Sequence, residues 1–225
     1  MELHKIKAII FDFDGLIIDT ESAWYDSYNE VLRAFQSELS LSEFGRFIGT
    51  SSKEFGELLE RKVQSKMNFR EIKEMAMSIH KEKMKNALAR EGVREYLDEA
   101  KSLGLSIGLA TSSTKDWVVG FLKKLQILDF FDVIQTCDDV ELVKPDPTVY
   151  ANVIRLMGIS PKEAIAFEDS VNGCKAAIAA GLNCVIIPNP VTRELIFENY
   201  HLRLSSMSDK RLIEVIEYIV NSHEI

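Results

Sequence analysis

The sequence predicts an α/β protein with a doubly wound, Rossmann-like parallel sheet and an inserted all-α, helical-bundle cap. Two observations predict this class. From Gly92 onward, short apolar runs alternate with amphipathic helices, which is typical of a parallel sheet covered on both faces. Before that point, residues 21–90 show helical periodicity and no strand-like run. The helical block follows the first apolar run, so we interpret it as an insertion into the sheet domain.

The predicted domain bounds follow from this insertion. The core domain is discontinuous and comprises residues 1–18 and 91–225, and the helical cap comprises residues 19–90. A chain of 225 residues is long for one domain and short for two equal ones, which suits a core with one insertion. Hinges between the two are expected near residues 17–19 and 90–92.

Each element is predicted from its own pattern. Cap helices are expected after Asp19 and Thr20, at about 41–47 and 53–63, and at 69–90 behind the N-cap Asn68. Core strands are expected at 8–11, 105–110, 131–135, 164–167 and 184–187, with helices at 93–103, 117–125, 147–157, 176–180 and 208–221. Ser160, Pro161 and Glu163 form a capping box that opens a single turn before the fourth strand.

Composition narrows the function classes. With 46% hydrophobic and 28% charged residues, the chain is an ordinary soluble globular protein. No apolar stretch is long enough to cross a membrane, and the first residues are not expected to be a secretory segment. Three cysteines without C-x-x-C spacing are expected to be reduced and the protein cytoplasmic. A net charge of −8 argues against general nucleic-acid binding, although residues 46–90 carry 11 Lys/Arg against 6 Asp/Glu. That excess suits either a solvated helical face or a basic lid, and a monomer is expected.

Polar side chains follow successive predicted strands, and they make up the candidate site. Ligands gather at the carboxyl ends of the strands in such a sheet. The residues at these ends are Asp12, Asp14, Thr111, Ser112, Ser113, Glu168 and Asp169, and a loop adds Lys144. Asp12 and Asp14 are two apart, so a strand would point both the same way. Capping of turns and helices is the alternative role for these carboxylates.

Each residue type has a chemical role if the substrate is a phosphoester. Asp12 would be the nucleophile that forms an aspartyl-phosphate. Asp14 would protonate the leaving alcohol and then activate water. Asp12 and Asp169, helped by Glu168, supply the hard oxygen ligands that Mg²⁺ requires.

The remaining residues of this rim would bind the phosphoryl group. Thr111 would donate a hydrogen bond to a phosphoryl oxygen, and Lys144 would balance charge. Gly15 and the backbone N–H groups after Asp12 would surround the oxygens, with Ser112 and Ser113 as further phosphate contacts. Thr111 and Lys144 also have a purely structural interpretation: Thr111 as an ordinary strand end, and Lys144 as a surface lysine in a turn.

These segments together resemble the haloacid dehalogenase superfamily, in the branch of β-phosphoglucomutase-like and phosphoglycolate-phosphatase-like enzymes. The matching motifs are Asp12-Phe-Asp14-Gly-Leu, Leu109-Ala-Thr111-Ser-Ser, Lys144-Pro-Asp-Pro and Phe167-Glu168-Asp169-Ser170. The resemblance covers essentially the whole chain, including the cap. It implies the nucleophile and acid/base roles given above, and metal ligation by Asp12, the Asp14 backbone carbonyl and Asp169, with Glu168 nearby. Dehalogenases and phosphonate-cleaving relatives lack the second aspartate, so the presence of Asp14 makes the chain resemble the phosphate-ester branch.

Two departures separate the chain from the mutase. The mutase has a cap histidine ten residues after its acid/base aspartate, where this chain has Trp24. If Gly49 is aligned with the mutase's loop glycine, Ser52 replaces its cap arginine, with Lys53 adjacent. Both losses favour hydrolysis over phosphoryl transfer.

The sequence therefore predicts a Mg²⁺-dependent phosphatase acting on a small phosphorylated metabolite. A phosphosugar mutase is the alternative, and a receiver-like signalling domain is the non-enzymatic one; Asp12 on the first strand argues against the latter. In the cap, Thr20, Gly49, Thr50 and Lys53 are candidates for substrate contact, or else for helix capping. Trp24 is expected to pack within the cap. The four histidines show no ligand spacing and are expected on the surface.

Overall fold

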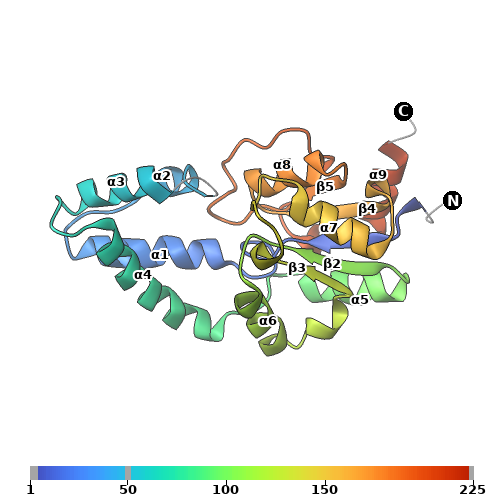
Figure 1. The fold of residues 1–225 in the computed structure, drawn as a ribbon, viewed down its shortest axis with the longest axis horizontal. Helices are drawn as coiled ribbons and strands as arrows, with labels where there is room; N and C mark the ends of the chain where they lie inside the picture. The colour runs from blue at the N-terminus through green and yellow to red at the C-terminus, as the bar shows by residue number, and fades with distance from the viewer. Residues whose placement is uncertain (1–4, 49–51, 223–225) are drawn as a thin grey trace. The chain divides into compact units, whose positions relative to one another are not determined.

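The computed structural model describes residues 5–48 and 52–222, which form two compact units (Figure 1). The core unit comprises the chain up to Ile18, Leu88–Pro188 and the residues from Ile196 onward. The cap unit comprises Asp19–Ala87 and Asn189–Leu195. Two bounds differ from the sequence-based division, because residues 88–90 lie in the core unit and Asn189–Leu195 lie in the cap unit.

A parallel sheet forms the centre of the core unit. Its strands are β1 (Ala8–Phe11), β2 (Ser106–Ala110), β3 (Val133–Gln135), β4 (Ala164–Glu168), β5 (Asn183–Ile186) and β6 (Leu202–Arg203). Their order in the sheet is β3-β2-β1-β4-β5-β6, and every neighbouring pair is parallel. The chain thus winds outward from β1 in both directions, which confirms the predicted fold class. The two-residue strand β6 was not predicted.

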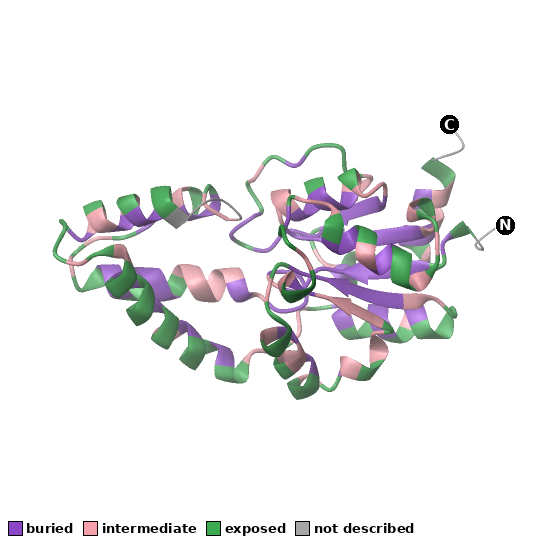
Figure 2. Ribbon diagram, in the orientation of Figure 1, coloured by how far each residue is buried: buried purple, intermediate pink, exposed green. Residues whose placement is uncertain are grey.

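Helices cover both faces of this sheet. They are α5 (Val93–Ser102), α6 (Lys115–Lys124), α7 (Thr148–Met157), α8 (Val171–Ala179) and α9 (Leu212–Ser222), with short 3-10 turns at Leu128–Phe130, Cys137–Asp139, Pro161–Glu163 and Met207–Asp209. α7 packs on β2, β3 and α8, whereas α5 packs on β2 and α9. Strands β1, β4 and β5 are buried along their whole length (Figure 2), as their continuous apolar runs require.

Local signals explain several element boundaries. Ser160 and Glu163 form the predicted capping box around the turn at Pro161–Glu163. Gly92 begins α5 in the left-handed region, at φ +82°, and a Cβ there would lie 2.6 Å from Met207. Both the positive φ and the close approach exclude a side chain at this position.

The cap unit is helical. Its elements are α1 (Thr20–Arg33), α2 (Leu41–Gly45), α3 (Ser52–Lys62), α4 (Phe69–Lys83) and the 3-10 turn Met84–Asn86. Asp19 accepts a hydrogen bond from the Ser22 N–H and caps α1, and Asn68 caps α4, as the sequence predicted. The prediction that the last helix continues to residue 90 is wrong, because α4 ends at Lys83.

The cap has its own apolar core. Tyr28, Leu32, Leu59 and Ile72 are among its buried members. Val191, which follows β5 in the sequence, is buried in the same cluster. A Cβ at Gly45 of α2 would lie 3.3 Å from the Val191 carbonyl oxygen, so the segment Asn189–Leu195 packs closely on α2. This tertiary contact places the segment in the cap unit.

Arg90 ties together the chain segments at which the core unit adjoins the cap in sequence. Its backbone N–H donates to the Ile17 carbonyl at 2.8 Å. Its guanidinium donates to the carbonyls of Gly15, of Ile187 at 3.2 Å and of Pro188 at 2.8 Å. One arginine therefore fixes the end of the β1 loop, the return from the helical insertion and the exit from β5.

Candidate active site

Three neighbouring strands end beside one another and position the predicted site. β1 lies between β2 and β4, with Phe11 in register with both Leu109 and Phe167. The Asp12 N–H continues the ladder by donating to the Phe167 carbonyl at 3.0 Å. Asp12, Thr111 and Glu168 therefore meet at the carboxyl edge of the sheet, where the sequence predicted the site.

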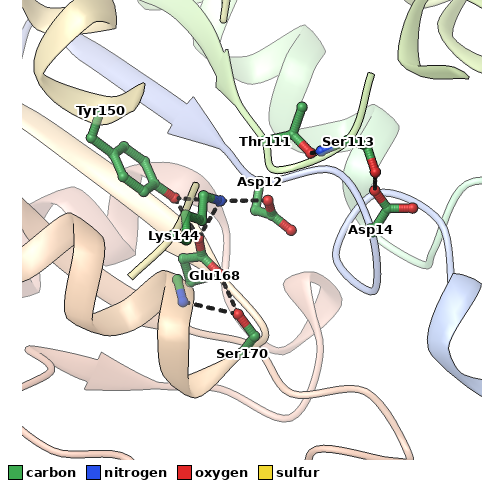
Figure 3. A network of polar contacts seen from close by, with 9 residues as sticks. Asp12, Asp14, Thr111, Ser113, Lys144, Tyr150, Glu168 and Ser170 are labelled. Atoms are coloured by element: carbon green, nitrogen blue, oxygen red, sulfur yellow. Dashed lines mark hydrogen bonds and ion pairs between the residues drawn. The ribbon is translucent and has the colours of Figure 1, made fainter. Parts of the chain in front are cut away.

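Lys144 links two of these strand ends. Its Nζ lies 2.5 Å from Oδ1 of Asp12 and 2.6 Å from Oε1 of Glu168 (Figure 3). The Tyr150 hydroxyl donates to the same Glu168 oxygen at 2.6 Å, and Nζ lies 4.8 Å from the centre of the Tyr150 ring. All four side chains are buried. A buried charge requires such pairing, so the Lys144 turn is part of the site.

Burial dominates the ionisation of this cluster. It raises the pKa of Asp12 to about 7; Lys144 opposes the rise, and the negative charges of Glu168 and Asp14 add to it. Burial alone would lower the pKa of Lys144, but Asp12 and Glu168 together hold it above its usual range. Lys144 therefore stays charged, but its single positive charge is too little to neutralise the carboxylates around it.

Asp12, Glu168 and Asp169 form an acidic cluster that fits a divalent cation. One carboxylate oxygen from each lies within 4.8 Å of the other two, and all three residues are buried. Carboxylate oxygens are the ligands of hard cations such as Mg²⁺. A cation here would offset the burial, and the repulsion from neighbouring carboxylates, that raise the pKa of Asp12. The donor set is therefore chemically suited to the predicted metal.

Helix α8 begins directly against Glu168. Ser170 is its N-cap, accepting from the Gly173 N–H at 3.0 Å and donating to Oε2 of Glu168 at 3.3 Å. A Cβ at Gly173 would lie only 1.9 Å from that oxygen. Only glycine allows the first turn of α8 to approach the carboxylate so closely.

Asp14 occupies a different environment from Asp12. It is half-buried, and its two oxygens accept hydrogen bonds from Ser113 Oγ at 2.5 Å and from Trp117 Nε1 at 3.1 Å. Ser113 thus contacts a predicted catalytic residue, where the sequence analysis gave it a phosphate contact. Trp117 was not predicted as a site residue.

The other predicted phosphate contacts lie on the same edge with differing exposure. Thr111 is buried, and its Oγ1 accepts from the Ser113 N–H at 3.1 Å. Ser112 is exposed. The Gly15 N–H donates to the Ile18 carbonyl at 2.7 Å within its own turn, at φ +81°. The turn thus already uses this N–H, and phosphate contact by Gly15 stays a prediction.

The predicted cap candidates belong to the cap unit. Thr20 is the buried first residue of α1, and Lys53 is exposed on α3. Gly49 and Thr50 lie outside the described residues. Substrate contact by these four residues stays a prediction.

The surface expectation for the histidines is wrong for His80. It is buried, and its ring stacks on Trp24 with the ring centroids 4.0 Å apart. The signal was present in the sequence, because His80 follows Ile72 and Ala76 at steps of four and so lies on the buried face of α4. Trp24 packs within the cap, as predicted. His4 and His223 lie outside the described residues.

Tyr150 was also missed. It lies on the apolar stripe of α7 with Val149, Val153 and Ile154, where a tyrosine suggests ordinary core packing. Its hydroxyl nevertheless bonds to Glu168. The sequence signal that could have identified Tyr150 is its hydroxyl, because a buried tyrosine hydroxyl needs a polar partner.

Comparison with known proteins defines the class. The model of the family described as "Haloacid dehalogenase-like hydrolase" matches residues 9–187, so the chain belongs to this family. This confirms the family that the motifs predicted. Within the described residues, no helix is both long and apolar enough to cross a membrane.

Particular relatives sharpen this placement. The chain is 47% identical over 216 residues to "Putative phosphatase YhcW" of Bacillus subtilis (strain 168), covering 95% of this chain and 98% of that protein. It is 31% identical over 181 residues to "Phosphorylated carbohydrates phosphatase" of Thermotoga maritima, covering 79% and 82% of the two. The crystal structure of CbbY from Rhodobacter sphaeroides in complex with phosphate is similar, with a TM-score of 0.69 and 26% identity over 91% of this chain and 96% of that one.

Proposed function

We propose that this protein is a Mg²⁺-dependent phosphatase that hydrolyses a small phosphomonoester through an aspartyl-phosphate on Asp12. The observation that carries the proposal is the contact of Lys144 with Asp12 at 2.5 Å, beside the buried acidic cluster. A buried lysine on one oxygen of Asp12 holds the other oxygen in a defined direction. Relatives that are named phosphatases support the same reaction class.

The first step would transfer the phosphoryl group to the enzyme. A carboxylate oxygen of Asp12 attacks phosphorus, a new O–P bond forms and the P–O bond to the leaving alcohol breaks. Asp14 gives its proton to the departing oxygen. Thr111, which follows the neighbouring strand β2, and Lys144, from the turn before α7, would contact the phosphoryl oxygens as their charge shifts.

The second step would release phosphate. Asp14, now a carboxylate, takes a proton from water as the water oxygen attacks phosphorus. The bond between Asp12 and phosphorus breaks, which restores Asp12 as a carboxylate and Asp14 as an acid. Atoms and protons balance over the two steps, so the enzyme needs no further reactant.

Asp12 and Asp169, with the Asp14 backbone carbonyl, would hold the metal ion. When bound, Mg²⁺ would neutralise charge on these carboxylates and on the phosphoryl group. Glu168 already accepts from Lys144, Tyr150 and Ser170. We therefore assign Glu168 a supporting role: it holds Lys144 in place and lies next to the metal ligands.

We infer that the substrate is a small phosphorylated metabolite, and that a phosphorylated carbohydrate is the first class to test. One relative is named for phosphorylated carbohydrates, and others are named hexitol phosphatase. A phosphosugar mutase is the alternative. Trp24 stands where the mutase has its cap histidine, and its ring is stacked on His80, which favours hydrolysis.

Phosphate release from a panel of phosphomonoesters tests the proposal. Wild type with Mg²⁺ should release phosphate from at least one sugar or polyol phosphate, and Asp12→Asn should lose at least about a thousandfold in turnover. Asp116→Asn, an exposed aspartate on α6, is the matched control and should retain full activity. Chelation should abolish turnover and added Mg²⁺ should restore it.

Two results would contradict the proposal. Activity of Asp12→Asn comparable to wild type would exclude Asp12 as the nucleophile. A wild type that releases no phosphate, yet interconverts sugar phosphates when a bisphosphate is supplied, would establish the mutase instead.

A further inference from the structure

Asp14 is held by two neutral donors from a single segment of the core unit. Ser113 Oγ donates to Oδ2 at 2.5 Å, and Trp117 Nε1 donates to Oδ1 at 3.1 Å. Figure 3 shows the Asp14 carboxylate directed at Ser113, while Asp12 is directed at Lys144. Each carboxylate oxygen of Asp14 thus has a donor, and both donors follow β2 in the sequence.

The Ser113 donor is itself fixed. Its backbone N–H donates to Thr111 Oγ1 at 3.1 Å, and its carbonyl accepts from the Cys137 N–H at 3.1 Å. The segment therefore has hydrogen bonds on both sides of the hydroxyl that contacts Asp14. A hydroxyl in such a fixed loop can hold an acceptor in one orientation without reorganising.

The Trp117 indole is fixed by packing. It lies in the first turn of α6, and its ring meets the Phe121 ring edge to face at 4.6 Å. Phe121 lies 6.4 Å from the ring of Phe13, the residue between the two aspartates. The indole N–H is thus supported by contacts between rings that reach the loop after β1. Side chains locked by packing aim their polar groups most accurately.

We propose that Trp117, together with Ser113, is a positioning residue for the acid/base Asp14. This inference deepens the proposed function and rests on it. When Asp14 gives its proton to the leaving oxygen as the P–O bond breaks, the carboxylate that forms has a donor on each oxygen. These hydrogen bonds strengthen as the negative charge develops, so they favour the transition state over the bound substrate.

The effect should depend on the leaving group. An alkyl phosphate needs its leaving oxygen protonated, whereas a nitrophenyl phosphate leaves readily without a proton. Trp117→Phe removes the N–H and keeps a ring. It should lose about ten- to a hundredfold in kcat on an alkyl phosphate, with KM little changed, because a hydrogen bond to a charged group is removed. The loss on nitrophenyl phosphate should be no more than about threefold.

Three further variants test the positioning role. Ser113→Ala should show the same substrate-dependent loss, and Ser113→Thr, which keeps the hydroxyl, should regain most of the activity on the alkyl ester. Phe121→Leu disturbs the packing of Trp117 without removing a donor. Any loss in Phe121→Leu should therefore also be larger on the alkyl ester, and it should be smaller than in Trp117→Phe because the donor is kept.

The outcomes distinguish this inference from the proposed function. A loss in Trp117→Phe that is equal for alkyl and nitrophenyl esters, or a gain in activity, would overturn the positioning role alone. The same holds if Ser113→Ala and Ser113→Thr behave alike. If the wild-type enzyme hydrolyses none of the esters, the proposed function is overturned, and the positioning role with it.

Discussion

The core unit and the cap unit bury different kinds of polar side chain. In the part of the chain that the structure describes, the buried charged residues are Asp12, Lys144, Glu168 and Asp169, and all of them lie at the core site. The buried polar residues of the cap unit carry no formal charge at neutral pH; they are Thr20, Ser27, Asn29, His80, Asn189 and Thr192. Burial of a charge is costly, so its restriction to one edge of one unit marks where the chemistry occurs.

In the cap unit, the buried titratable residue His80 is neutral, whereas the buried charges of the core site are paired. Burial lowers the pKa of His80 to about 4, partly offset by a hydrogen bond to the Thr20 backbone. His80 is therefore neutral near pH 7 and stacks on Trp24 at an interplanar angle of 11°. The core accepts charges and pairs them, whereas the cap keeps its ionisable group uncharged. The next four predictions test this difference, from the largest expected effect to the smallest.

Replacing Lys144 should have the largest effect. Lys144→Met leaves Asp12 and Glu168 buried without their cation, so the free energy of unfolding should fall by about 3–5 kcal/mol and turnover should be lost. Denaturant unfolding and phosphate release measure the two effects. Lys144→Arg keeps the charge and should be more stable than the Met variant. An unfolding free energy for Lys144→Met within about 1 kcal/mol of wild type would show that the pairing is unimportant.

Protonation of His80 should destabilise the fold at low pH. Its folded pKa of about 4 lies below the ordinary value of 6.5, so the unfolded chain binds the proton more readily. Stability is therefore complete above pH 6.5 and falls as the pH drops toward 4, by roughly 2–4 kcal/mol from this group. The measurement is urea unfolding of wild type and His80→Phe across this range. A difference between them that does not vary with pH would contradict the account.

Gly173 tests how closely the core site is packed. In Gly173→Ala the Cβ would displace the Glu168 carboxylate, which should cost about 1–3 kcal/mol of stability and reduce turnover through Lys144. Gly120→Ala on α6 is the matched control, since no atom lies within 4 Å of its added Cβ, and it should be neutral or stabilising by up to about 1 kcal/mol. Thermal unfolding of both variants measures this. Equal effects of the two substitutions would refute the packing argument.

An exposed ion pair of the cap should matter least. Arg70 and Glu74 lie 2.9 Å apart on α4, with 86% and 62% of their side chains exposed. Water screens such a pair, so Arg70→Ala should leave the unfolding free energy unchanged within the error of the measurement. Denaturant unfolding at low and high salt checks this. A measurable loss at low salt that disappears at high salt would show that cap charges are more than a solvated surface.

The core site could be predicted because its residues are placed by topology. Apolar strand runs and parallel winding bring Asp12, Thr111 and Glu168 to one edge, whatever the details of packing. Lys144 was predicted from its motif, although its two carboxylate partners depend on how the loop after η4 (Cys137–Asp139) folds. These features follow from local pattern and chain direction, which the sequence carries directly.

The missed features depend on side-chain packing between distant segments. Trp117 and Tyr150 lie on helices whose apolar spacing indicates core. Their polar atoms bond to residues of other segments, Asp14 in the loop after β1 and Glu168 at the end of β4. The packing of Asn189–Leu195 on the cap has no local signal, because it is a tertiary contact of Val191. His80 was the exception, since its spacing from Ile72 and Ala76 did indicate burial.

Trapping the phosphorylated enzyme tests the central claim most directly. Asp14→Asn should still accept a phosphoryl group from nitrophenyl phosphate, whose leaving group needs no proton, but it lacks the base for the hydrolysis of the intermediate. After acid quenching, peptide mass spectrometry should find one added phosphoryl group on Asp12. A burst of nitrophenol without modification of Asp12, or a phosphoryl group on another residue, would contradict the account.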